Sequence, residues 1–410
     1  MDKLRGVPEM SINRQLLNLT AADFIVRTAY QMGKTPLLPL FAASLGANAT
    51  FLGFIVSAST LTGILLKPMF GLLSDRWGRW IWFFTGTLLF TVTPFLYLWI
   101  ETPDELLLLR LIHGLATAIY GPVTVAWVME QGQEYGIISH NCAERLGWFG
   151  MGRCGGYLLG PTLAAALLTI IEPETVFTLI GLLSSFAFFP VLLLKNRDNP
   201  QRHCKSWRIQ ITEALSTGFQ TAELWLAGIL EFVVYLGLYA AKTFLPLYAL
   251  QQGIPVLWVG VFFTTQELIH LVARPYGGRL SDRLGYLPVT AAGMMLAALS
   301  LGLLPLVETS LPLLLLAIVF GLAQALIFPS TLALYAHSMD SSHTGAGAGL
   351  IGALKNSGKI AGPIIGGLII HWHDYSWMLW SMAALLTLWS IGLLLSIFCR
   401  KSFAYQWESR

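Results

Sequence analysis

The sequence predicts an all-α membrane protein with twelve transmembrane helices in two similar six-helix bundles, and three observations lead to this fold class. Of the 410 residues, 55% are hydrophobic and only 11% are charged, whereas soluble domains carry about 25% charged residues. Long apolar runs recur along the chain, and each is long enough to cross roughly 30 Å of hydrocarbon as a helix. The third observation is an internal repeat, since the second half of the chain aligns with the first.

The helices follow from the apolar runs in chain order. The plainest are FFTGTLLFTVTPFLYLWI at 83–100 and LWSMAALLTLWSIGLLLSIF at 379–398, which lack the alternation of barrel strands. We expect spans at 15–45, 51–72, 81–100, 105–130, 146–171, 174–194, 220–249, 256–277, 287–307, 311–337, 345–370 and 375–398. Between the sixth and seventh spans the chain is polar and basic. We therefore expect an N-terminal bundle at 1–194, a cytoplasmic linker at 195–217 and a C-terminal bundle at 218–410.

The basic residues of the connecting segments predict the orientation in the membrane. One set of connections, together with the termini, holds sixteen Lys and Arg residues. The other set holds none, at 46–50, 101–104, 172–173, 250–255, 308–310 and 371–374. Because basic residues accumulate on the cytoplasmic side, both termini are predicted to be cytoplasmic. We expect a monomeric multi-pass protein of the inner (plasma) membrane.

The internal repeat is carried by motifs that recur in the same order. KPMFGLLSDRWG at 67–78 matches RPYGGRLSDRLG at 274–285, and GLATAIYGPVTVA at 114–126 matches GLAQALIFPSTLA at 321–333, both at an offset of 207 residues. GPTLAAAL at 160–167 matches GPIIGGLI at 362–369 at an offset of 202. Each half crosses the membrane an even number of times, so the halves share one orientation, as in the parallel repeats of some secondary transporters. Binding is then expected between the halves, near the middle of the membrane.

These motifs resemble those of the major facilitator superfamily over nearly the whole chain. The family's signature loop between helices 2 and 3, G-x-x-x-D-R-x-G-R, is matched by Gly71, Asp75, Arg76, Gly78 and Arg79. A weaker copy between helices 8 and 9 is formed by Gly278, Asp282, Arg283 and Gly285, with Tyr286 in place of the last arginine. The resemblance implies the major facilitator fold.

The signature loop is expected to act as a gate. Asp75 can pair with Arg79 or lie near the positive N-terminus of the eleventh helix, as the resemblance implies. Such a contact holds the inner ends of the two halves together, and it breaks when the protein opens inward. Glu130 and Arg145 are predicted to extend this network. The alternative is that the basic residues of the loop only set the topology.

Ionisable side chains inside the predicted spans mark the expected substrate and proton cavity. Asp23, Arg27, Tyr30 and Lys34 share one face of the first helix, and Glu231, Tyr235 and Lys242 repeat that face on the seventh. A charge at bilayer depth costs about 2.5–3.5 kcal/mol, so these groups should face a wet cavity or a partner. The other candidates are Arg110, Arg153, Glu267, His270, Gln324, Lys355 and Lys359. Their excess of positive charge favours an anionic or zwitterionic substrate, and structural ion pairs such as Asp23 with Arg27 are the alternative.

Two further motifs concern the coupling of transport to protons and the direction of transport. Small residues and prolines on the fifth and eleventh helices allow close packing; they are Gly156, Gly160, Pro161, Gly358, Gly362 and Pro363. The pattern on the fifth helix, and an R-x-x-x-G motif that begins at Arg110, resemble those of the drug:proton antiporter branch. The resemblance implies proton-coupled efflux of a small amphipathic, anionic or zwitterionic compound. The titrating group would be Asp23, Glu231, Glu267 or His270, and helix packing alone is the alternative for the fifth-helix motif.

Other function classes are less favoured. An importer or exchanger of an organic anion or phosphorylated metabolite on the same fold is the alternative that the cationic cavity supports. An intramembrane enzyme would need a catalytic cluster, and the one metal-like grouping, His371, His373 and Asp374, lies in a predicted outer loop. The sequence has no G-x-x-x-x-G-K-[ST] motif and its four cysteines are scattered. We expect no enzyme, cofactor, metal or nucleic acid, and the expected partners are a small-molecule substrate, the proton and the lipid bilayer.

Overall fold

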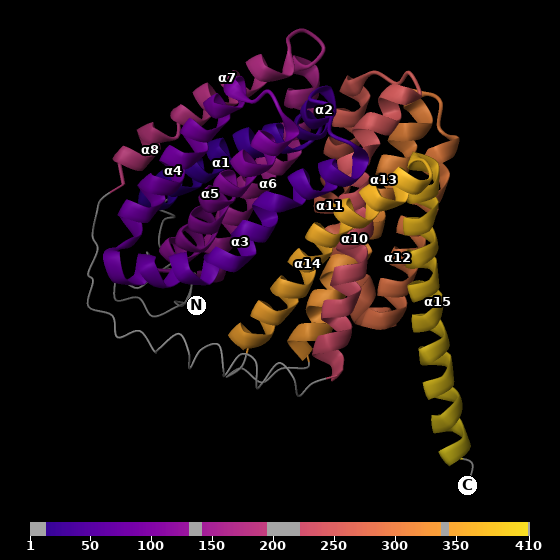
Figure 1. Cartoon of the computed structure of the whole chain (residues 1–410). Helices are drawn as coiled ribbons and strands as arrows, with labels where there is room; N and C mark the ends of the chain where they lie inside the picture. The colour runs from indigo at the N-terminus through magenta and orange to yellow at the C-terminus, as the bar shows by residue number, and fades with distance from the viewer. Residues whose placement is uncertain (1–13, 131–141, 195–221, 338–343, 409–410) are drawn as a thin grey trace, which may run out of the picture.

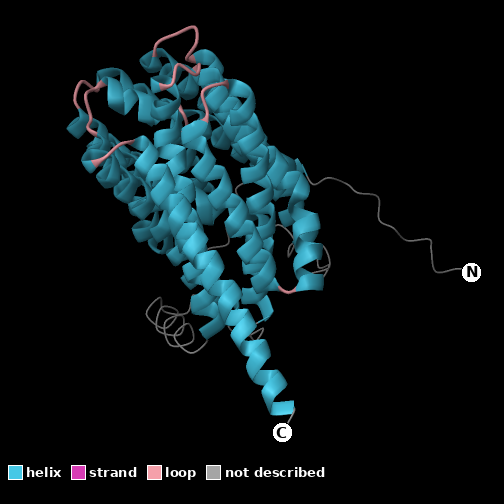
Figure 2. Cartoon of the chain, turned by 90° about the vertical axis from the view of Figure 1, so that its right-hand side faces the viewer, coloured by secondary structure: helices cyan, strands magenta, loops and turns pink. Residues whose placement is uncertain are grey.

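The computed structural model describes residues 14–130, 142–194, 222–337 and 344–408, and this part of the chain is helical without any β-strand (Figures 1 and 2). The first half contains α1 (Arg14–Lys34), α2 (Leu37–Ser44), α3 (Ala49–Trp77), α4 (Arg79–Leu96), η1 (Tyr97–Trp99), α5 (Pro103–Glu130), α6 (Cys142–Leu167), α7 (Pro173–Ser185) and α8 (Phe188–Leu192). The second half contains α10 (Ala222–Gln251), α11 (Val256–Leu284), α12 (Tyr286–Leu303), η2 (Leu304–Leu306), α13 (Ser310–His337), α14 (Thr344–Trp372) and α15 (Tyr375–Glu408).

The twelve predicted spans are present in the described part of the chain and form two six-helix bundles, which confirms the predicted fold class. Two of the spans are interrupted, because α1 with α2 and α7 with α8 each cover one predicted helix. By length and composition, nine helices within the described residues are apolar enough to cross a membrane. The remaining three spans lie at α1–α2, α6 and α14, and they carry charged side chains such as Asp23, Arg153 and Lys355. The predicted linker, 195–217, lies outside the described residues.

Two helix boundaries differ from the sequence-based expectation. The first span was expected as one helix over 15–45, but α1 ends at Lys34 and α2 begins at Leu37. Pro36 has no amide hydrogen to donate, and it disfavours a helical conformation of the residue before it, which explains the break. The signature motif was expected to form a loop after residue 72. Instead α3 continues to Trp77, and the turn into α4 is made by the single residue Gly78, with φ of 94°.

The two bundles meet at one side of the molecule and diverge toward the other (Figure 1). At the side where they meet, the Ser57 hydroxyl in α3 donates a hydrogen bond to Ile360 O in α14, at 2.8 Å. The Thr162 hydroxyl in α6 likewise donates to Thr264 Oγ1 in α11, at 2.7 Å. We call this the closed side. The open side is where α3 and α11 end, and it is also the side where α1 begins and α15 ends.

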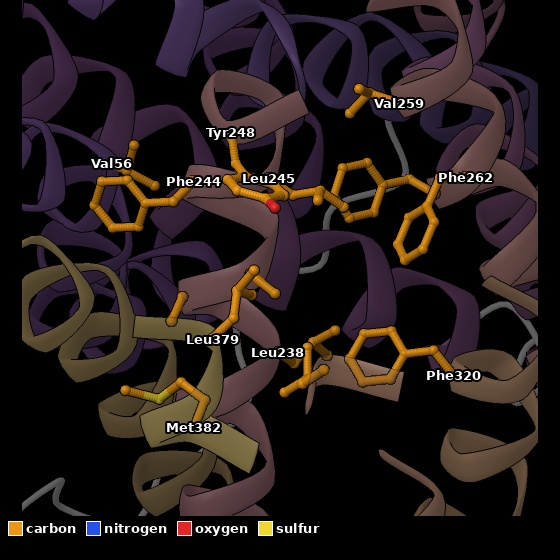
Figure 3. Close-up of a cluster of buried hydrophobic side chains, with 14 of the residues drawn as sticks. Val56, Leu238, Phe244, Leu245, Tyr248, Val259, Phe262, Phe320, Leu379 and Met382 are labelled. Carbon is orange, nitrogen blue, oxygen red and sulfur yellow. The ribbon is translucent and has the colours of Figure 1, made fainter. Parts of the chain in front are cut away.

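On the closed side, apolar side chains of the two bundles pack against each other. One buried cluster includes Phe244, Phe262 and Leu379 of the second bundle together with Val56 of the first (Figure 3). Conversely, large apolar side chains such as Ile170, 79% exposed, and Phe189, 73% exposed, lie on the outer surface. A soluble monomer rarely exposes extensive apolar surface, so this outer surface suits contact with lipid.

Candidate functional site

A pocket lies between the two bundles, as the repeat predicts. It encloses about 550 Å³ of space free of protein atoms, part of it open to solvent. Side chains from α1, α2, the turn between them, α3, α6, α10 and α11 line it, and they include Gln31, Lys34, Thr35, Pro39, Val56, Tyr157, Pro161, Tyr239, Lys242, Thr243, Phe263 and Glu267. Lys34 and Lys242 occupy equivalent positions of the two halves, 208 residues apart. The pocket therefore receives a cation from each half.

Tyrosine rings hold the lysines in and beside this pocket. Lys34 Nζ lies 5.0 Å and Lys242 Nζ 5.9 Å from the centroid of the Tyr239 ring, so both lysines share one aromatic partner. Lys359 Nζ lies 5.5 Å from the same centroid. Cation–π contacts of this kind contribute about 0.5–2 kcal/mol and leave the positive charge unneutralised. Within the described residues, none of these three lysines has a carboxylate oxygen within 4.0 Å, so each can accept an anionic group of a ligand.

The first bundle contains a closed ion cluster around Asp23, which is fully buried. Arg153 Nε and Nη2 donate to its two carboxylate oxygens, each at 3.1 Å, and Arg27 Nη2 lies 3.4 Å from Oδ1. Arg153 also donates to the Thr124 hydroxyl at 3.1 Å. A fork of two parallel hydrogen bonds from arginine to carboxylate is among the strongest polar contacts in proteins. Asp23 was expected to line the cavity, but it is not among the residues that line the pocket and instead holds α1 and α6 together.

The second bundle has the equivalent residues but not the equivalent ion pair. Glu231, Lys355 and Thr331 stand at the repeat positions of Asp23, Arg153 and Thr124. Glu231 Oε1 lies 2.6 Å from Thr331 Oγ1, and its Oε2 is buried without a hydrogen-bond partner among the described residues. Lys355 Nζ instead lies over the Tyr235 ring, 4.6 Å from its centroid. Glu231 and Lys355 are therefore not in contact.

The predicted polar groups of α11 and α13 do come together. His270 Nδ1 lies 3.6 Å from Glu267 Oε1, and the Gln266 amide donates to Gln324 Oε1 at 2.9 Å. Gln266 also donates to Glu267 Oε2 at 3.3 Å. Glu267 is the carboxylate that lines the pocket. It brings a negative charge within the same space as Lys34 and Lys242, so the pocket can hold both an anionic and a cationic group of one ligand.

Arg110 lies inside the first bundle and is not among the residues that line the pocket. Its guanidinium is 1% exposed and donates to Ser59 Oγ at 2.5 Å and Tyr97 Oη at 3.3 Å, with His113 Nδ1 at 3.5 Å. The partners are neutral oxygens and an imidazole. Tyr30, the third residue of the predicted stripe on α1, points to the same interior, where it packs edge-on against His113. A small cavity of about 240 Å³ opens beside these rings.

The gate motif differs between the two halves. Arg79 pairs with Asp75 and with Glu130, the latter at 2.9 Å, and it also hydrogen-bonds to Ser74. The structure therefore places Glu130 in this network, whereas the side chain of Arg145 lies outside the described residues. Arg76 is exposed beside the pair. In the second copy Asp282 and Arg283 are exposed, without an ion pair within the described residues.

The small residues of α6 and α14 lie where these helices approach the first helix of each half. A Cβ atom added at Gly160 would come within 2.6 Å of Gln31 Cβ, and one at Gly362 would overlap Leu236 O. Pro161 and Pro363 follow each of these glycines inside the helix. Both halves thus use the same close approach, which any larger side chain would prevent.

Several residues of the site were not predicted. Tyr157, Tyr239, Ser59, Tyr97 and His113 were missed, although Tyr239 follows Tyr235 by one helical turn. Thr124 and Thr331 occupy equivalent positions of the aligned repeat, and this equivalence could have identified them as site residues. Among the described residues, no group of three His, Cys, Asp or Glu side chains is placed to hold a metal ion.

Comparison with known proteins establishes the family. The model of the Major Facilitator Superfamily matches residues 24–265 and, as a second match, 227–404. The chain belongs to the major facilitator superfamily. The two overlapping matches together span almost the entire described chain, in agreement with the fold.

Two similar proteins and one solved structure illustrate the range of this family. An uncharacterised MFS-type transporter, YuxJ of Bacillus subtilis, is 25% identical over 85% of this chain and 89% of its own length. The quinolone resistance protein NorA of Staphylococcus aureus is 22% identical over 82% of this chain and 85% of its own. The crystal structure of the nucleoside transporter NupG (D323A mutant) superposes with a TM-score of 0.79, at 14% identity, over 93% of this chain and 99% of that chain. The protein is thus a multi-pass membrane transporter of this superfamily.

Proposed function

We propose that this major facilitator protein exports a small amphipathic compound with an anionic or zwitterionic charge by alternating access, and that protons drive the export. The observation that carries the proposal is the pocket between the bundles. Lys34 and Lys242 from equivalent helices face Glu267 across a space lined by Tyr157 and Tyr239. Lysines attract anions, the tyrosine rings provide apolar contact, and Glu267 accommodates a cationic group. The proposed orientation, with both termini cytoplasmic, makes the open side the cytoplasmic side.

The direction of transport is supported by relatives rather than by the pocket. NorA is named for quinolone resistance, and a resistance protein that removes a compound from the cell works as an exporter. The open side of the pocket, in the proposed orientation, accepts a compound from the cytoplasm. A proton-driven exporter also needs a titrating group in or near the pocket, and Glu231, Glu267 and His270 are available there.

Transport into inside-out membrane vesicles tests the proposal. Vesicles that carry the protein and are acidified inside should accumulate an anionic or zwitterionic aromatic compound from a defined panel, and collapse of the pH gradient should release it. The Lys34→Gln/Lys242→Gln double variant should lose this accumulation. Asp104→Asn, which alters an exposed carboxylate at the closed side, should retain it. Accumulation that is equal in the double variant and the unchanged protein contradicts the proposed pocket.

A second candidate function is import or exchange of an organic anion or a phosphorylated metabolite. The specific observation in its favour is the excess of cations: Lys34, Lys242 and Lys359 surround one tyrosine ring without a carboxylate within 4.0 Å in the described residues. The same vesicles separate the two functions. Uptake of the anion by right-side-out vesicles, with none by acidified inside-out vesicles, indicates import, and anion-for-anion exchange without a pH gradient indicates an exchanger.

A further inference from the structure

On the closed side, α3 of the first bundle meets α14 of the second at a glycine and a serine that lie one helical turn apart. A Cβ atom added at Gly53 would overlap Pro363 O, so the two backbones touch there. The Ser57 hydroxyl donates to Ile360 O at 2.8 Å. Within membranes, hydroxyl groups of neighbouring helices commonly bond to backbone groups close to a proline. Gly53 and Ser57 therefore both contact the backbone of α14 around its proline.

A second contact of the same construction joins α11 of the second bundle to α6 of the first. A Cβ atom added at Gly260 would lie 2.7 Å from Pro161 O. The Thr264 hydroxyl donates to Leu158 O at 2.7 Å and accepts a hydrogen bond from the Thr162 hydroxyl, also at 2.7 Å. The two contacts are repeat equivalents, because the glycines and the donating hydroxyl residues are 207 residues apart and the accepting carbonyls 202.

The two contacts lie directly behind the pocket. Val56 and Phe263, which precede the two donating hydroxyl residues, are also repeat equivalents, and both line the pocket. Pro161 lines it as well. The pocket wall on the closed side is thus continuous with the contacts that join the bundles there.

We propose that these two contacts form the gate of the closed side, and that the hydrogen bonds donated by Ser57 and Thr264 keep this gate shut. The inference rests on the proposed alternating access and names the residues of its outer gate. Each contact joins one bundle to the other, so both must break when the closed side opens. By contrast, the ion cluster around Asp23 and the close approach at Gly160 lie within one bundle and stay intact.

Distances between spin labels on the purified full-length protein test this gate without substrate and at one pH. Labels at Ile170 and Trp372, both exposed, report on the closed side. Ser57→Ala should lower the ratio of the short to the long distance about fivefold, as expected for one hydrogen bond. Thr264→Val removes two hydrogen bonds and should lower the ratio further.

The double variant and a matched control make this measurement decisive. The two contacts share no partner, so the effects of Ser57→Ala and Thr264→Val should multiply. Thr62→Val is the control, because the Thr62 hydroxyl bonds within its own helix, to Ala58 O at 3.1 Å. Its distances should equal those of the unchanged protein. A double variant in which the short distance is undiminished overturns the proposal.

Glycine variants test the same gate if the double variant does not fold. Gly53→Ala and Gly260→Ala each place a methyl group against the opposite bundle. The closed side should then fail to shut, and the long distance should predominate. Gly392→Ala is the control, since no atom lies within 4 Å of a Cβ added there. Folded Gly53→Ala and Gly260→Ala proteins that keep the short distance contradict the proposed gate.

Vesicle transport separates this inference from the proposed function. If the distances lengthen in the gate variants but the unchanged protein shows no accumulation in acidified inside-out vesicles, the gate is supported and proton-driven export fails. If the unchanged protein accumulates the compound but no gate variant changes the distances, export stands and the assignment of Ser57 and Thr264 is wrong.

Discussion

The two halves of the molecule carry the same three-residue constellation in two different electrostatic states. In the first bundle Asp23, Arg153 and Thr124 form a closed network in which each oxygen of the carboxylate accepts a hydrogen bond from an arginine. In the second bundle the Thr331 hydroxyl donates to Glu231 Oε1, whose Oε2 has no hydrogen-bond partner among the described residues, and Lys355 lies over the Tyr235 ring. An ion pair therefore fixes the carboxylate of the first bundle, whereas among the described residues no ion pair fixes the equivalent carboxyl group of the second bundle.

The two copies of the gate motif also differ in charge pairing. Arg79 in the first copy is bonded to Asp75, Ser74 and Glu130, while Asp282 and Arg283 in the second copy are exposed. Both halves nevertheless keep the close helix approach at their glycines. Packing is therefore shared by the halves and charge pairing is not. A mutation that acts through packing should have equal effects in both halves, and one that acts through charge should not.

The largest expected difference between the halves concerns Arg153 and its counterpart Lys355. Arg153→Met leaves Asp23 buried with a single remaining cation, and removal of one partner of a buried ion pair costs about 3–5 kcal/mol. Lys355→Met breaks no ion pair among the described residues and removes the contact with the Tyr235 ring, so it should change the free energy of unfolding by less than about 1 kcal/mol. Unfolding of both variants in detergent solution measures the difference. Equal destabilisation of the two variants would show that the halves are electrostatically alike.

Overpacking at the helix approach should affect both halves equally. Gly160→Leu and Gly362→Leu each introduce a side chain where another helix already lies, at a cost of about 1–3 kcal/mol. Gly352→Leu is the matched control, since no atom lies within 4 Å of a Cβ added there. Thermal unfolding should show similar losses for the first two variants and none for the third. A loss confined to one half would mean that only one bundle depends on this packing.

The fold was predictable from the sequence because hydropathy, basic-residue bias and the repeat act over whole helices. The pairing of side chains was not. The spacing of Asp23 and Arg27 along one helix indicated a pair, but the stronger partner of Asp23 is Arg153, 130 residues later. Which of two equivalent carboxyl groups acquires such a partner depends on side-chain geometry at the helix contact, and the sequence holds no signal for it.

Arg110 illustrates the same limit. A charge inside a span was expected to face the shared cavity, yet its guanidinium lies within the first bundle, bonded to Ser59 and Tyr97. Neutral hydroxyl groups can satisfy an arginine, so a charge within a span does not by itself show which space the side chain faces. By contrast, Lys34 and Lys242 were predicted at equivalent positions and both line the pocket.

Within the pocket, the lysines of the two halves should contribute alike to substrate binding. Lys34→Gln and Lys242→Gln should each weaken binding of an anionic substrate about tenfold, which corresponds to about 1.4 kcal/mol. The substrate is the compound that the vesicle panel identifies, and its dissociation constant is measured on the purified variants. A loss of affinity for only one of the two variants would assign the substrate to one bundle instead of the shared pocket.

The smallest expected effect is at the gate motif. Arg79→Gln removes a partly buried arginine with two carboxylate partners and should lower the free energy of unfolding by about 1 kcal/mol or less, as for partly exposed ion pairs. In the second copy Tyr286 stands at the position of Arg79, and the exposed Arg283 is the basic residue of the motif. Arg283→Gln should have no measurable effect. Unfolding in detergent compares the two, and a larger effect for Arg283→Gln would contradict the described asymmetry.

Alternating access between the bundles is the central claim, and paired spin labels test it directly. One pair at Trp77 and Leu284, both exposed, reports on the open side. The other pair at Ile170 and Trp372, also exposed, reports on the closed side. When the pH is changed or the identified substrate is added, the distance between the first pair should shorten as the distance between the second pair lengthens. If neither distance changes at any pH or with any compound that raises the unfolding temperature, the bundles do not alternate and the account is wrong.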